Sequence, residues 1–111
     1  MAAKIVLITG ANHGIGYETA KAFLQSQNPY HILLGTRSLQ KGDEALQNLR
    51  AECPNVMNAI ELLQIDVASD ESITRAFEVV KKGHGRLDTL INNAGKQIVS
   101  TLHSGVPVVS V

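Results

Sequence analysis

The chain has 111 residues, a length that matches one small domain. Ten basic residues balance ten acidic ones, so no overall charge favours nucleic acid or an anionic membrane as a partner. The sequence shows no apolar window long enough for a membrane span and no signal peptide at its start. Cys53 is the single cysteine, which excludes a disulfide framework and predicts a cytoplasmic protein.

Strand and helix patterns alternate along the chain. Short apolar runs predict buried strands at residues 4–9, 30–37, 59–67 and 86–92. Amphipathic segments between them predict helices at residues 15–27, 39–51 and 70–82. We expect Ser69 to cap the third helix and Gly83 to end it.

This order predicts an α/β fold with a parallel, doubly wound sheet of the Rossmann type. Strands one to three should lie in the order 3-2-1, with the fourth strand beside the first. We interpret residues 1–95 as a dinucleotide-binding half-domain, truncated after the fourth strand, and residues 96–111 as a tail outside it.

A glycine-rich loop joins the first strand to the first helix. In "TGANHGIG", Gly10 permits a tight turn, Gly14 lets the backbone approach a pyrophosphate, and Gly16 lets helix and strand pack closely. Backbone N–H groups at the helix start would face the anion. The alternative is a plain turn, and His13 is either a phosphate contact or a simple loop histidine. The predicted cofactor site in this loop comprises Gly10, Asn12, His13, Gly14, Ile15 and Gly16.

The end of the second strand indicates which nucleotide is bound. An NAD site usually has an acidic residue here for the ribose 2′-hydroxyl, whereas this chain has Thr36, Arg37 and Ser38. An arginine offers a fork to a 2′-phosphate. We therefore expect NADP in preference to NAD, unless Arg37 is only a solvated surface charge.

Three motifs in order resemble the short-chain dehydrogenase/reductase family, especially its carbonyl-reductase-like members that prefer NADPH. They are Thr9–Gly16, Asp66-Val67 and Asn92–Gly95. The resemblance implies that Asp66 bonds the adenine amino group, that Val67 packs on the ring, and that Asn93, Ala94 and Gly95 border the cofactor ribose. It also implies hydride transfer between a nicotinamide dinucleotide and a small carbonyl or alcohol substrate. Without the family, a capping or loop role is the alternative for Asp66, and turn residues are an equally good interpretation of the two asparagines.

The family's catalytic serine and Tyr-x-x-x-Lys pair follow the last of these motifs, and no tyrosine follows Tyr30 in this chain. We therefore predict no catalytic residue here. Tyr17 and Lys21 have the right spacing but lie in the first helix, so we interpret them as a packing residue and a solvated one. Ser100 and Ser104 are interpreted as parts of an unrelated terminus.

Metal binding is not expected. The spacing of His31, His84 and His103 forms no cluster with carboxylates, and Cys53 reads as a helix-end residue. The valine-rich tail favours extended structure. We expect the fourth strand to be an exposed sheet edge through which the chain associates with a partner. The resulting hypothesis is an NADP-dependent oxidoreductase by family that lacks its catalytic residues; the alternatives are a non-catalytic binding module and a non-functional truncated product.

Overall fold

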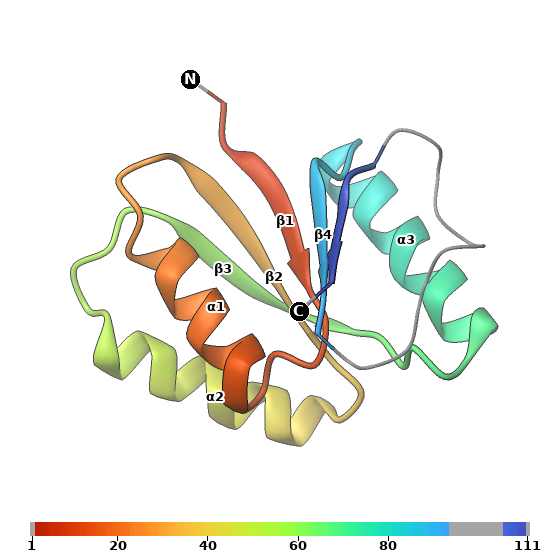
Figure 1. Ribbon diagram of the computed structural model, residues 1–111, viewed down its shortest axis with the longest axis horizontal. Helices are drawn as coiled ribbons and strands as arrows, with labels where there is room; N and C mark the ends of the chain where they lie inside the picture. The colour runs from red at the N-terminus through yellow and green to blue at the C-terminus, as the bar shows by residue number, and fades with distance from the viewer. Residues whose placement is uncertain (1, 94–105, 111) are drawn as a thin grey trace.

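The computed structural model describes residues 2–93 and 106–110, in which helices and strands alternate (Figure 1). The strands are β1 (Lys4–Ile8), β2 (Tyr30–Thr36), β3 (Ala59–Gln64), β4 (Thr89–Asn92) and β5 (Val108–Ser110). The helices are α1 (Gly14–Leu24), α2 (Leu39–Glu52) and α3 (Asp70–His84). All the strand pairs are parallel, and the strand order is β3-β2-β1-β4-β5. The α/β class and the predicted order of the first four strands are confirmed.

Both faces of the sheet are covered, which explains why the strands are apolar at successive positions. On one face, Val6 and Ile8 of β1 pack with apolar residues of α1 and α2. On the other face, Ile5 and Leu7 pack with the apolar stripe of α3. Figure 1 shows α1 and α2 on one side of the strands and α3 on the other. A strand between two helix layers buries both sets of alternating side chains, so its sequence reads as a continuous apolar run.

The ends of α3 confirm one local prediction and correct another. Ser69 caps the helix, because its Oγ accepts a hydrogen bond of 3.2 Å from the backbone N–H of Ser72. The predicted stop at Gly83 is wrong, since α3 continues to His84 and ends at Gly85. Gly85 has a φ of 76°, and its N–H donates to the carbonyl oxygen of Lys81. This left-handed conformation at the helix end favours glycine, which has no Cβ.

The fourth strand is not the edge of the sheet, contrary to prediction. The N–H of Leu90 donates to the carbonyl oxygen of Pro107 at 2.9 Å, and β5 pairs with β4 through residues 108–110. The extended structure expected for the tail is confirmed there. The edge is β5 instead, where Val108 and Val109 remain 41% and 50% exposed. Our predictions for Ala94, Gly95, Ser100, His103 and Ser104 fall outside the described residues.

Candidate functional site

The glycine loop forms an open turn at the carboxyl end of β1. Gly10 and Gly14 both have a φ of 60°, a conformation that glycine adopts at little cost. A Cβ at Gly14 would meet no atom within 4 Å, so the space beside this backbone is open. His13 precedes α1 in an extended conformation, and its side chain makes no capping hydrogen bond. The first N–H groups of α1 therefore keep their capacity to bind an anion.

Gly16 lies in the tightest part of the loop. A Cβ at this position would lie 2.4 Å from the carbonyl oxygen of Gly10 and 2.5 Å from Nδ2 of Asn93. Both distances are far below van der Waals contact, so the start of α1 is packed directly against the turn. The close approach that the sequence predicted for Gly16 is made to the loop after β1 and to Asn93, the residue after β4.

A hydrogen-bond network joins this turn to the end of β4. Nδ2 of Asn93 donates to the carbonyl oxygen of Gly10 at 3.2 Å. The hydroxyl of Thr9, which is fully buried, donates to Oδ1 of Asn92 and accepts from the N–H of Asn93, each at 3.0 Å. The asparagines therefore hold the loop in place. Sequence reasoning included Thr9 only as the first letter of a motif, although a hydroxyl inside an apolar strand end signals a buried partner.

At the carboxyl end of β2, Arg37 and Ser38 have different surroundings. Oγ of Ser38 accepts from the N–H of Lys41 at 3.3 Å and caps α2. The hydroxyl of Thr36 donates to the carbonyl oxygen of Ser38 at 3.0 Å, which fixes the turn. Arg37 is exposed, and its carbonyl oxygen accepts from the side chain of Gln64. Hydrogen bonds thus hold the turn, while Arg37 is exposed to solvent.

Arg37 and Asp66 line one hollow of about 670 Å³ beside β3 and α3, together with Ser69 and Arg75. Oδ1 of Asp66 accepts from the N–H of Ala68 at 3.0 Å, so this carboxylate also organises its own turn. The second carboxylate oxygen remains able to accept from a ligand. The loop interpretation of Asp66 is therefore compatible with its predicted binding role.

The remaining predicted residues belong to the glycine loop or follow Asp66 directly. Asn12 is half-buried in the loop, and Ile15 is exposed at the start of α1. Val67 is half-buried and packs against the core on the α3 side of the sheet. The structure brings Gly10, Gly16 and Asn93 into contact, and it brings Arg37 to the same hollow as Asp66.

Tyr17 and Lys21 do not form a catalytic pair. The Tyr17 hydroxyl donates to one oxygen of Glu52, and Lys21 Nζ forms an ion pair of 2.7 Å with the other. Burial, followed by the hydrogen bond to Glu52, raises the pKa of Tyr17 to about 12. A tyrosine that exchanges protons near neutral pH needs its pKa lowered, not raised. Lys21 is ion-paired with Glu52, which corrects the expectation that it is simply solvated.

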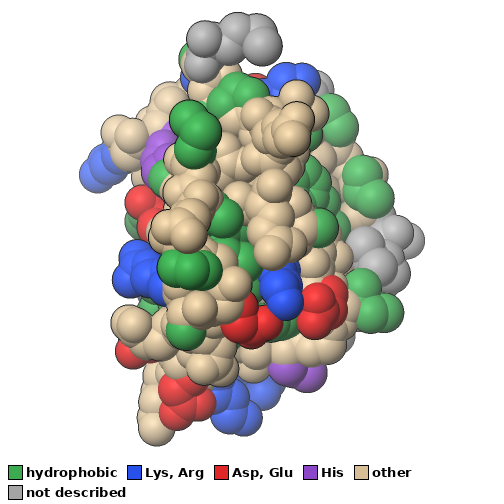
Figure 2. Space-filling view, turned by 90° about the vertical axis from the view of Figure 1, so that its left-hand side faces the viewer, with side chains coloured by type: hydrophobic (Ala, Val, Ile, Leu, Met, Phe, Trp, Pro, Cys, Tyr) green, Lys and Arg blue, Asp and Glu red, His purple; other side chains and the backbone are tan. Residues whose placement is uncertain are grey.

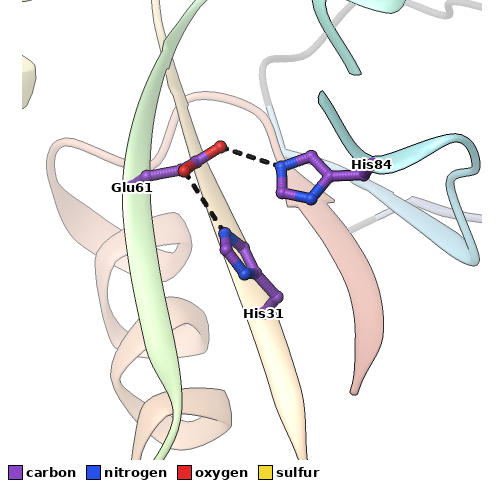
Figure 3. Close-up of side chains that lie close together, drawn as sticks. All are labelled: His31, Glu61 and His84. Carbon is purple, nitrogen blue, oxygen red and sulfur yellow. Dashed lines mark hydrogen bonds and ion pairs between the residues drawn. The ribbon is translucent and has the colours of Figure 1, made fainter. Parts of the chain in front are cut away.

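The expectation that the histidines form no cluster with a carboxylate is wrong. His31, Glu61 and His84 lie together, with one potential ligand atom from each residue within 4.8 Å of the others (Figure 3). Their positions in the sequence gave no spacing signal, because the three residues come from two neighbouring strands and a helix end.

Two further surface properties bear on the expected partners. Among residues 2–93 and 106–110, no helix is both long and apolar enough to cross a bilayer. On the face drawn in Figure 2, acidic and basic side chains are interspersed with apolar ones. Charges of both signs therefore share this face.

Comparison with known proteins agrees with the glycine loop and the strand order. The family model described as short chain dehydrogenase matches residues 4–106. The chain belongs to the short-chain dehydrogenase family. Among curated members, it is 42% identical over 92 residues to the short-chain dehydrogenase/reductase tropE of Talaromyces stipitatus. That alignment covers 83% of this chain and 35% of the relative.

Solved structures of the family superpose on the same region. Menthone neomenthol reductase from Mentha piperita matches with a TM-score of 0.77 and 31% identity, over 86% of this chain and 33% of that protein. L-Sorbose reductase from Gluconobacter frateurii, complexed with NADPH and L-sorbose, matches with a TM-score of 0.72 and 30% identity, over 86% and 34%. The chain therefore spans about a third of the length of the dehydrogenases it matches.

Proposed function

We propose that this chain binds the adenine half of NADP(H) for an oxidoreductase that interconverts a small carbonyl and an alcohol. The observation that carries the proposal is the open glycine turn in front of α1. Its backbone is accessible at Gly14, its helix start lacks a side-chain cap, and Asn93 anchors it from β4. Short-chain dehydrogenases bind a nicotinamide dinucleotide, and such a turn with free N–H groups fits its pyrophosphate.

The preference for NADP over NAD rests on Arg37. The residue follows β2 directly, is exposed, and shares a hollow with Asp66. In this proposal the guanidinium binds the 2′-phosphate while Ser38 holds the turn and supplies a second polar group. Asp66 accepts the adenine amino group, and Val67 packs on the ring. L-Sorbose reductase, whose structure contains NADPH, supports this choice by similarity alone.

The substrate class follows from the family rather than from a pocket in this chain. Menthone neomenthol reductase and L-sorbose reductase are both named for reductions of small molecules. In the proposal, Asn93, Ala94 and Gly95 border the cofactor ribose, and none of the described residues serves as the proton donor. We place the activity in the cytoplasm, a reducing compartment in which a lone thiol such as Cys53 stays unpaired.

Isothermal titration calorimetry of the purified chain, with NADPH and separately with NADH, tests the proposal. We expect NADPH to bind more tightly, and adenosine 2′,5′-bisphosphate to compete with it. Arg37→Ala should weaken NADPH binding by roughly 10–100-fold, since hydrogen bonds to charged groups contribute about 1.5–3 kcal/mol. Its effect on NADH should be small.

Arg50→Ala is the matched control, because Arg50 is an arginine in the last turn of α2 and does not line the hollow of Arg37. It should leave both affinities unchanged. Equal affinity of the parent chain for NADH and NADPH would refute the role of Arg37. If neither NADPH nor NADH binds, the cofactor site itself is refuted.

A further inference from the structure

Three side chains converge at the amino end of the sheet, on the face covered by α3. His31 is near the start of β2 and pairs with Ala59, and Glu61 of β3 pairs with Leu33. Residues two apart on a strand share a face, so this register places His31 and Glu61 diagonally on one face. His84 is the last residue of α3 and continues the buried stripe of Phe77 and Val80. Figure 3 shows the Glu61 carboxylate beside the two rings, with one oxygen directed to His31 and the other to His84.

The distances among the potential ligand atoms are short. Nε2 of His84 lies 2.9 Å from Oε1 of Glu61, and Nε2 of His31 lies 3.4 Å from Oε2. Zinc bound tetrahedrally at about 2.0–2.1 Å holds adjacent ligand atoms roughly 3.3 Å apart. These two separations bracket that value. All three potential ligand atoms lie within 4.8 Å of one another, so side-chain rotations would bring them around one cation.

His31 has an unsatisfied nitrogen. Its Nε2 is shielded from solvent and has no hydrogen-bond partner among the described residues, since its approach to Glu61 is an ion-pair contact only. The side chains of His31 and His84 are 24% and 16% exposed, while Glu61 is 51% exposed. A buried polar atom without a partner is unfavourable unless something else satisfies it. The half-exposed carboxylate provides a route from solvent to this position.

A simple ion pair is the competing explanation. It accounts for the bond between Glu61 and His84. It does not account for Nε2 of His31, which lies near the carboxylate without a hydrogen bond, in a ring that packs edge to face on that of His84 with centroids 4.5 Å apart. A cation that binds two neutral rings and one carboxylate satisfies all three.

We propose that His31, Glu61 and His84 form a zinc-binding site that ties the end of α3 to β2 and β3. Two imidazole nitrogens and one carboxylate oxygen are a donor set that suits zinc, and the fourth position is filled by water. The site joins a helix end to two strands that it otherwise meets through apolar packing. Metal binding at such a junction stabilises the folded chain, because the site does not exist in the unfolded one.

This site is independent of the proposed cofactor site. His31 lies near the amino end of β2, whereas Arg37 follows its carboxyl end. The glycine loop likewise follows the carboxyl end of β1. Zinc binding can therefore be measured with no nucleotide present, and its failure would leave the cofactor proposal untouched.

Calorimetric titration of the chelator-treated chain with Zn²⁺ tests the proposal. We expect one ion per chain and a higher melting temperature in its presence. Loss of a residue that only supports a metal ligand costs roughly 10–100-fold in affinity. Loss of a ligand itself should cost at least as much as the upper end of that range. We therefore expect zinc binding to weaken by about 100-fold or more in each of three variants, His31→Gln, Glu61→Gln and His84→Gln. With Co²⁺ as the probe, visible absorption typical of a tetrahedral site should appear in the parent chain and be lost in these three variants.

The two histidines outside the cluster, His13 and His103, provide a matched control. The double variant His13→Gln/His103→Gln keeps the cluster and should bind zinc as the parent does. Glu61→Gln preserves size and shape, and a cooperative thermal transition by circular dichroism shows that each variant still folds. Absence of saturable zinc binding by the folded parent chain would overturn the proposal. So would equal losses of affinity in the control and the cluster variants.

Discussion

The two ends of the sheet differ in how their polar residues are distributed along the chain. At the carboxyl end, the glycine loop and the start of α1 come from one continuous segment, Gly10–Gly16, held by Asn93. At the amino end, His31, Glu61 and His84 come from three separate elements. Local chemistry determines the first arrangement, whereas register and helix length determine the second. A continuous motif can be recognised in a sequence, and a cluster made by packing cannot.

The largest expected effect is on zinc affinity, and it distinguishes the amino end of the sheet from the carboxyl end. His84→Gln should reduce zinc affinity by about 100-fold or more, because a direct ligand is lost. The same variant should change NADPH affinity by less than about twofold, since distant sites couple weakly. Parallel titrations with Zn²⁺ and NADPH measure both. A variant that loses both ligands together would show that the two ends are not independent.

Gly16→Ala should produce the converse result. The added Cβ would lie 2.4 Å from the Gly10 carbonyl oxygen, so the turn must shift. We expect a loss of about 1–3 kcal/mol in the free energy of unfolding. NADPH binding should weaken while zinc affinity is retained. Urea denaturation and the same two titrations provide the measurements.

Gly83→Ala is the control for that substitution. A Cβ at Gly83 would meet no atom within 4 Å, and the residue lies inside α3. Alanine is favoured over glycine in a helix by about 0.5–1 kcal/mol, so stability should rise slightly. An equal loss of stability in both variants would contradict the close packing at Gly16.

A smaller effect on stability is expected at Thr9, which links β1 to β4 at the carboxyl end of the sheet. Thr9→Val keeps the shape but removes a hydroxyl with two hydrogen bonds, and should cost about 1–2 kcal/mol of stability. Thr19→Val is its control, because that hydroxyl bonds within α1 near the surface. Its effect should stay within about 0.5 kcal/mol. Denaturation of the two variants side by side distinguishes a buried network from a surface contact.

The smallest effect concerns Tyr17, whose spacing to Lys21 imitates a catalytic pair. The pKa of Tyr17 is raised from 10.0 to about 12, so the unfolded chain loses this proton first as the pH rises. The folded chain should therefore lose stability between pH 10 and 12. Tyr17→Phe should decline less steeply in that range, whereas Tyr30→Phe should follow the parent. Thermal melts across the range provide the test, and identical slopes for all three proteins would contradict the raised pKa.

Much of the fold could be predicted because its signals are local. Apolar runs marked the strands, and the cap at Ser69 was visible in the sequence. The end of α3 was harder, since Gly83 and Gly85 are both suitable residues. The choice depends on where the apolar stripe of α3 stops packing on the sheet, and His84 extends that stripe. The same placement brings His84 to Glu61.

The tail shows a second kind of limit. Its valines indicated extended structure, but a strand also needs a neighbour, and β4 provides one through Leu90 and Ile91. No local pattern states which edge a strand will join, because pairing depends on backbone groups that every residue has. The error about the sheet edge came from treating β4 as the last strand.

By itself, the sequence determined the alternation of strands and helices, the glycine turn, and the membership in a dehydrogenase family that this turn marks. These follow from backbone preferences and from side-chain periodicity, which act over a few residues. Only the tertiary structure decided that Thr9 meets Asn92, that β5 pairs with β4, and that Glu61 meets two histidines. Those contacts depend on strand register and on the length of α3, and a change of one residue in either would separate them.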